Sequence, residues 1–178
     1  GDVRGLFQAQ SGIAPAARGT AAHQQLARAH GATLLDQTPV RSIRDAGGEV
    51  EVHTDSGTFR CGRLIIAADA WTNDLLQQLG LRLPLTITQE QVTYFASPHY
   101  ADYAPDRFPV WIWMDEPCFY GFPLYGEPAV KVAQDVGGRE VTAQTRTFDP
   151  DPAVLRRTEE FLARYLPTAL GPVHYSKT

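Results

Sequence analysis

Apolar residues in the first half of the chain recur first at helical and then at strand spacing. Ala22, Leu26 and Ala29 fall on one side of a helix predicted for residues 15–30, and Gly31 is typical of a residue that ends such a helix. Short alternating runs separated by glycine-containing turns then predict three strands, at residues 40–44, 49–54 and 58–61.

An unbroken apolar run at residues 63–68 is typical of a strand buried in a parallel sheet. It leads directly into a helix predicted for residues 70–79. The apolar stripe of that helix comprises Trp71, Leu75, Leu76 and Leu79. A strand, a turn and a helix in this order form the step at which open α/β sheets bind ligands.

The pattern changes after Leu83, where turns rich in proline, glycine and aspartate connect a series of strands. Four strands are predicted, at residues 86–96, 110–114, 118–122 and 129–133. Their short connections favour a largely antiparallel sheet. We therefore expect a domain boundary at residues 83–85.

A last helix is predicted for residues 152–166, with Asp151 as its N-cap. Its inward side comprises Val154, Phe161, Leu162 and Tyr165. Together these elements predict an α/β fold with an α+β second half.

Composition narrows the class of partner. The formal net charge of −4, with acidic and basic residues interspersed, indicates no nucleic-acid or membrane surface. No apolar run approaches the roughly 20 residues of a membrane span. Cys61 and Cys118 stand alone without metal-ligand spacing, which favours unpaired thiols in a cytoplasmic protein and no metal site. The five histidines are scattered, and His53 is interpreted as a surface residue.

Lys131 is the most informative candidate for chemistry. In an alternating strand it shares one face with Ala129 and Ala133, while Val130 and Val132 take the other face. Spacing alone favours a solvated strand lysine. The alternative is a lysine on a dry face, whose pKa would be lowered by desolvation and whose charge would have a use.

Several motifs together carry a resemblance to a known family. They are Gly31–Thr33 with Thr38–Val40, Leu64–Trp71, Tyr120–Pro123, Val130–Val132 and Tyr175–Thr178. In this order they resemble the monomeric sarcosine oxidase and N-methyltryptophan oxidase group of the D-amino-acid-oxidase-like flavoproteins, of which the chain would be a central fragment. The resemblance implies that residues 1–83 are part of a doubly wound FAD-binding domain, with residues 1–14 linking from the substrate domain. Residues 84–178 would belong to that mixed or antiparallel substrate domain.

The chemistry that the resemblance implies is oxidation of a small-molecule amine, typically an N-methyl amino acid, with hydride transfer to FAD and reoxidation by oxygen to give H₂O₂. Lys131 would then be the cation that promotes the reaction with oxygen, and Tyr120 would line the substrate pocket. The simpler interpretation of Tyr120 is an ordinary strand aromatic.

The implied flavin contacts are Val40, Ala68 and Trp71. Asp69 stands where the family has a glycine, and a carboxylate there suits the N-cap of the following helix. No G-x-G-x-x-G turn for a pyrophosphate occurs in this chain.

Two further departures concern the pocket and the cofactor link. Asp135 matches a family histidine of the substrate pocket, so an anion replaces a neutral or cationic group. Val173 stands at the position of the flavin-linking cysteine, so any FAD would be held without a covalent bond.

Other functions stay open. The chain alone is expected to be inactive, and it could be a non-catalytic α/β module that binds a partner or small ligand. A flavin-dependent dehydrogenase that does not use oxygen is a third hypothesis. Apolar surface left exposed by a partial domain predicts a homodimer.

Overall fold

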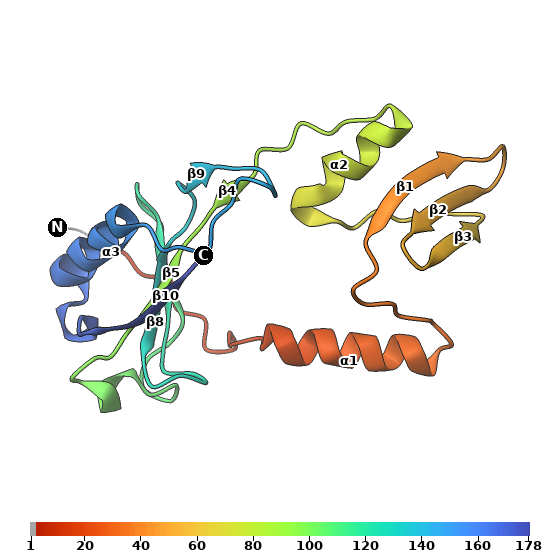
Figure 1. Cartoon of the computed structure of the whole chain (residues 1–178). Helices are drawn as coiled ribbons and strands as arrows, with labels where there is room; N and C mark the ends of the chain where they lie inside the picture. The colour runs from red at the N-terminus through yellow and green to blue at the C-terminus, as the bar shows by residue number, and fades with distance from the viewer. Residues whose placement is uncertain (1–2) are drawn as a thin grey trace. The chain divides into compact units, whose positions relative to one another are not determined.

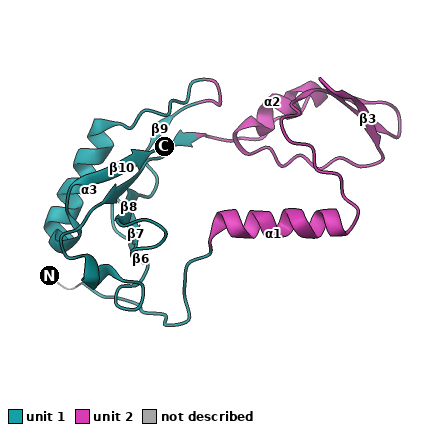
Figure 2. Cartoon of the chain, turned by 60° about the horizontal axis from the view of Figure 1, so that its bottom comes forward, with its two compact units in different colours: residues 1–14, 88–141, 145–178 teal, residues 15–87, 142–144 magenta. Residues whose placement is uncertain are grey.

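The computed structural model describes residues 3–178, and the chain separates into two compact units. Unit 1 contains residues 88–141 and 145–178 with the N-terminal segment up to Ala14, and unit 2 contains residues 15–87 and 142–144 (Figure 2). The connection from unit 2 to unit 1 falls between Ile87 and Thr88. The assignment of the two units to FAD-binding and substrate domains stays a prediction.

Unit 1 is built on a five-stranded antiparallel sheet with the order β10-β5-β8-β7-β6. These strands are β5 (Val92–Phe95), β6 (Trp111–Trp113), β7 (Phe119–Phe122), β8 (Val130–Gln134) and β10 (Val173–Lys177). A second pair joins β4 (Thr88–Gln89) to β9 (Arg139–Glu140). The predicted antiparallel strands are confirmed, except that the strand predicted for residues 86–96 is divided into β4 and β5. The pattern of apolar residues did not predict β9 and β10.

The core of unit 1 lies between the sheet and α3 (Pro152–Tyr165), which covers one face of the sheet in Figure 1. Asp151 caps α3 by accepting a hydrogen bond of 2.7 Å from the Ala153 N–H, as predicted. Phe161 stacks on Phe119 with ring centroids 4.1 Å apart, and Leu162 is fully buried. The predicted inward side of the helix is thus confirmed at its centre.

Gly121 of β7 has a packing role on the α3 face. It pairs with Trp111, whose indole lies over the Gly121 backbone and stacks on Phe161 with centroids 5.7 Å apart. A Cβ at Gly121 would come within 2.5 Å of the Trp111 ring. The glycine between Tyr120 and Phe122 is therefore required by the core rather than by the opposite face of the sheet.

We predict that Gly121→Ala destabilises unit 1 by about 1–3 kcal/mol, because the indole cannot move away without losing its contact with Phe161. Urea unfolding followed by tryptophan fluorescence measures the change. The matched control is Gly12→Ala, where a Cβ meets nothing within 4 Å. Equal stability of the two variants would contradict this account of the motif.

Unit 2 begins with α1 (Ala16–Ala29), whose predicted extent is confirmed. The Gly31 backbone has φ +86°, and the Ala32 N–H reaches back to the Ala27 carbonyl at 2.9 Å, so the glycine ends the helix as expected. The predicted apolar side of α1 is not buried by any described residue, and Leu26 is 58% exposed.

A meander of three antiparallel strands follows in unit 2. It consists of β1 (Val40–Asp45), β2 (Val50–Thr54) and β3 (Gly57–Cys61), in the order β1-β2-β3. All three strands were predicted.

The predicted parallel strand at residues 63–68 is wrong. This segment has no regular secondary structure, and Ile65 is 90% exposed. A strand is stabilised by hydrogen bonds to its neighbours, and no described strand pairs with this segment. The helix predicted for residues 70–79 is present in three short pieces. These are the 3₁₀ turn η1 (Asp69–Trp71), α2 (Thr72–Leu76) and the 3₁₀ turn η2 (Gln77–Leu79).

Among the helices of residues 3–178, none combines the length and the apolar character needed to cross a membrane.

Candidate functional site

The register of the five-stranded sheet aligns four side chains in one row. Tyr175 of β10 pairs with Tyr94 of β5, Tyr94 pairs with Lys131 of β8, and Lys131 pairs with Phe122 of β7. Directly opposite residues of antiparallel strands point to the same face. Since Val132 belongs to the core beneath α3, the row lies on the opposite face, which we call the Lys131 face.

The ammonium group of Lys131 lies against aromatic rings. Its Nζ is 4.6 Å from the centroid of the Phe122 ring and 5.7 Å from that of Tyr120. Burial lowers the pKa of Lys131, and the like charge of Lys177 lowers it further. Within the described part of the chain, no acidic side chain forms an ion pair with Lys131. Lys131 is thus a half-buried cation held by ring faces.

Tyr120 is the second predicted residue that the structure places here. Its ring meets the ring of Phe122 edge-on at 6.1 Å. Burial is the largest effect that raises the pKa of Tyr120, and the charges of Asp135 and Glu90 add to it. The phenol therefore stays protonated at neutral pH and is available as a hydrogen-bond donor.

Asp135 lies at the same end of the sheet as Tyr120. Its backbone N–H donates to the Cys118 carbonyl at 2.9 Å, and its side chain is exposed. Asp135 also contributes to the raised pKa of the Cys118 thiol, after the larger effect of burial. The structure thus brings Lys131, Tyr120 and Asp135 onto one sheet, whereas their roles stay predictions.

Two aromatic residues of this face were missed as candidates. Tyr94 and Tyr175 stack with centroids 4.4 Å apart, and the Tyr175 hydroxyl donates to Glu127 Oε1 at 3.2 Å. Burial raises the pKa of Tyr175 strongly, so it also stays protonated. Tyr175 lies in a motif that carried the resemblance, but only the pairing of β10 with β5 places it near Lys131.

The predicted flavin contacts lie in unit 2 and form a separate set. Val40 begins β1 and is 37% exposed, Ala68 precedes η1, and Trp71 ends η1 and is 50% exposed. None of them belongs to the Lys131 face.

Asp69 has a different role from the predicted helix cap. It is the first residue of η1, and Ala68 takes the N-cap position. Its backbone has φ +47°, in the left-handed region that glycine adopts without strain. This conformation gives a physical reason for the glycine that the family resemblance leads one to expect here.

We predict that Asp69→Gly stabilises unit 2 by about 0.5–1 kcal/mol, because the left-handed backbone costs a residue with a Cβ more than a glycine. Chemical denaturation measures the difference. The control is Asp36→Gly, since Asp36 is not among the described residues with positive φ and should lose stability or stay unchanged. Destabilisation by Asp69→Gly would contradict the strain.

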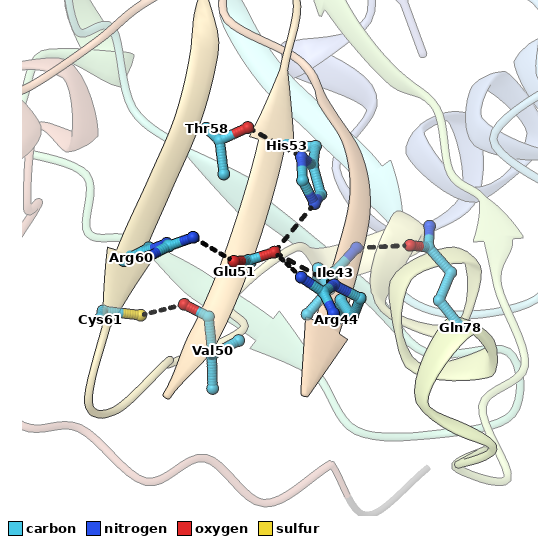
Figure 3. A network of polar contacts seen from close by, with 9 residues as sticks. All are labelled: Ile43, Arg44, Val50, Glu51, His53, Thr58, Arg60, Cys61 and Gln78. Carbon is cyan, nitrogen blue, oxygen red and sulfur yellow. Dashed lines mark hydrogen bonds and ion pairs between the residues drawn. The ribbon is translucent and has the colours of Figure 1, made fainter. Parts of the chain in front are cut away.

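A polar network in unit 2 surrounds Glu51, which is 4% exposed (Figure 3). Its carboxylate accepts hydrogen bonds from Arg44 on β1 and pairs with Arg60 on β3 at 2.9 Å. His53 Nε2 is 3.6 Å from the same carboxylate, and His53 Nδ1 is 2.9 Å from the Thr58 hydroxyl. His53 lies at the surface as predicted, with its side chain 38% exposed, but it has two polar partners there. The network joins all three strands, which indicates a structural role.

We predict that Glu51→Gln destabilises unit 2 at neutral pH. The hydrogen bond from Arg44 is the largest effect that lowers the pKa of Glu51. Its ionised form therefore contributes stability that is complete above the ordinary carboxyl pKa of about 4.3 and is lost as the pH falls through the lower folded value. Thermal unfolding between neutral pH and about pH 3 should show a smaller acid-dependent loss in the variant. Glu49→Gln, at an exposed turn position, should behave like the unchanged chain.

Comparison with known proteins identifies the class. The family described as "FAD dependent oxidoreductase" (DAO) matches residues 1–178, and the chain belongs to this family. Monomeric sarcosine oxidase of Bacillus sp. (strain NS-129) is 28% identical over 170 residues, which cover 93% of this chain and 44% of the relative. N-methyl-L-tryptophan oxidase of Salmonella heidelberg (strain SL476) is 27% identical over 176 residues, which cover 96% of this chain and 45% of the relative.

Among solved structures, NikD, described as an unusual amino acid oxidase essential for nikkomycin biosynthesis, superposes with a TM-score of 0.75 at 29% identity. The superposition covers 90% of this chain and 42% of NikD. The predicted family and mixed helix-and-sheet fold are thus confirmed. The chain spans less than half the length of these relatives.

The two units differ in how well their residues suit FAD. On the Lys131 face, an ammonium that has no acid partner among residues 3–178 fits a ring system that gains negative charge when it is reduced. In unit 2, the Asp69 carboxylate beside the predicted contacts Ala68 and Trp71 would repel a pyrophosphate. The described residues therefore fit the isoalloxazine ring of FAD better than its pyrophosphate.

Proposed function

We propose that this chain supplies the Lys131 face of an FAD-dependent amine oxidase that acts on N-methyl amino acids or related amines. The observation that carries the proposal is the position of the Lys131 ammonium, half-buried over Tyr120 and Phe122 with no acid partner among the described residues. Burying a cation without a counter-charge is costly, so its presence is best explained by chemistry that creates negative charge beside it.

Bound FAD would supply the redox chemistry, accepting a hydride from the carbon next to the amine nitrogen and passing two electrons to oxygen to give H₂O₂. Lys131 would hold positive charge where negative charge develops. Tyr120, kept protonated by its surroundings, would donate a hydrogen bond to the substrate. The stacked rings of Tyr94 and Tyr175 would keep water away from one side of Lys131.

The proposal is tested with a flavoprotein of full family length that contains this chain. We predict that Lys131→Met slows reoxidation of the reduced flavin by oxygen about 100-fold or more, because one preorganised charge is lost. Stopped-flow absorbance measures this step separately from anaerobic reduction by amine. The matched control Lys177→Met removes the exposed lysine of the same sheet and should change the rate much less.

The pH dependence gives a second readout. Because burial lowers the pKa of Lys131, its charge and the fast reaction with oxygen should be lost at a lower pH than for an ordinary lysine. Lys177→Met removes a like charge and should move this loss to higher pH. Reoxidation that is independent of Lys131 would favour the dehydrogenase hypothesis, and purified protein that binds no flavin would favour the non-catalytic module.

A further inference from the structure

Two carboxylates lie near Tyr120 at one end of the Lys131 face. Asp135 follows β8 and Glu90 precedes β5, and these antiparallel neighbours bring the two residues to the same end of the sheet. The residues adjacent to them point toward the α3 side. Gln134 accepts a hydrogen bond from Arg157 at 3.1 Å, and Gln91 accepts one from the Asp151 N–H at 2.6 Å.

Strand alternation therefore places Asp135 and Glu90 on the Lys131 face. Their effect on the Tyr120 pKa agrees with this placement.

The turn that follows Asp135 and leads from β8 to β9 is held against Glu90. The Gly138 N–H donates to both carboxylate oxygens of Glu90 at 3.2 Å. A Cβ on Gly138 would lie 2.1 Å from the Gln89 carbonyl oxygen, so only glycine allows this approach. Val136, next to Asp135, has φ +63°, which is strained for a β-branched residue. Strain of this kind persists only where the surrounding contacts fix the backbone.

The charges on this face are separated rather than paired. Among the described residues, neither Asp135 nor Glu90 forms an ion pair with Lys131 or Lys177. Glu127, the other acid of this face, accepts from the Tyr175 hydroxyl and lies 3.8 Å from His174 Nε2. Among residues 3–178, the two carboxylates at the Tyr120 end of the face thus form no ion pair with a cationic side chain.

We propose that Asp135 is a specificity-determining residue which, together with Glu90, selects amines that carry a second cationic group, such as N-methylated diamines or N-methylated basic amino acids. This inference rests on the proposed amine oxidase function. A second ammonium beside Tyr120 is attracted by the two carboxylates, whereas a substrate carboxylate at the same place is repelled.

The test compares kcat/KM for N-methyl-1,3-diaminopropane and sarcosine in the flavoprotein of full family length. We expect the diamine to be preferred, and Asp135→Asn to reduce that preference about tenfold, which corresponds to roughly 1.4 kcal/mol. Asp135→His should shift the preference further toward sarcosine. Asp106→Asn, an exposed acid elsewhere in unit 1, serves as the control and should leave it unchanged. A preference for sarcosine, or a preference that Asp135→Asn does not alter, overturns the inference.

A binding measurement separates this inference from the proposed function. The ligand is 1,3-diaminopropane, which lacks the N-methyl group, and its binding is followed by titration calorimetry without oxygen, so that no turnover takes place. Binding that weakens about tenfold in Asp135→Asn, but not in Asp106→Asn, supports the inference even if no amine reduces the flavin. Equal binding to the unchanged protein and to Asp135→Asn overturns it even if amines are oxidised.

Discussion

The feature on which the rest of the structure depends is the asymmetry of β8, the central strand of the five-stranded sheet. Val130 and Val132 point into the core beneath α3, and the same pleat turns Lys131 to the opposite face. The hydrophobic contacts of one face thus fix the backbone that holds the ammonium among aromatic rings. A shift of register by one residue would bury the lysine in the core, so packing on the α3 side sets the position of the charge.

Local patterns predicted the elements whose stabilising contacts join residues close to each other in the sequence. The end of α1 at Gly31 and the cap of α3 at Asp151 depend on residues a few positions apart, and the strand pairs of the meander β1–β3 join residues no more than 14 positions apart. Tyr120 and Lys131 lie in β7 and β8, which follow each other in the sequence and pair directly. Tyr175 could not be placed in this way, because its neighbour Tyr94 lies far away in the sequence and only the register of β10 on β5 joins them.

The errors share a physical cause. The apolar run at residues 63–68 has the composition of a buried strand, but composition describes only what a segment can bury and supplies no neighbour to bury it. The exposed apolar side of α1 is a second case. Glu51 is the opposite case, because it is a charged residue that is buried. Its position in a short strand gave no sign of burial, and only the strand pairing places Arg44 and Arg60 opposite it on the two sides.

The two acidic departures from the family pattern act in different ways. Asp69 adopts the left-handed backbone that suits a glycine, so the path of the chain is kept at the expense of local strain. Asp135 leaves the end of β8 paired with Cys118 and changes only the charge near Tyr120. Both place a carboxylate where the family resemblance implies a residue without negative charge. In the proposed amine oxidase, the Lys131 face would therefore supply the charge for flavin chemistry, and Asp135 would influence which amine can approach it.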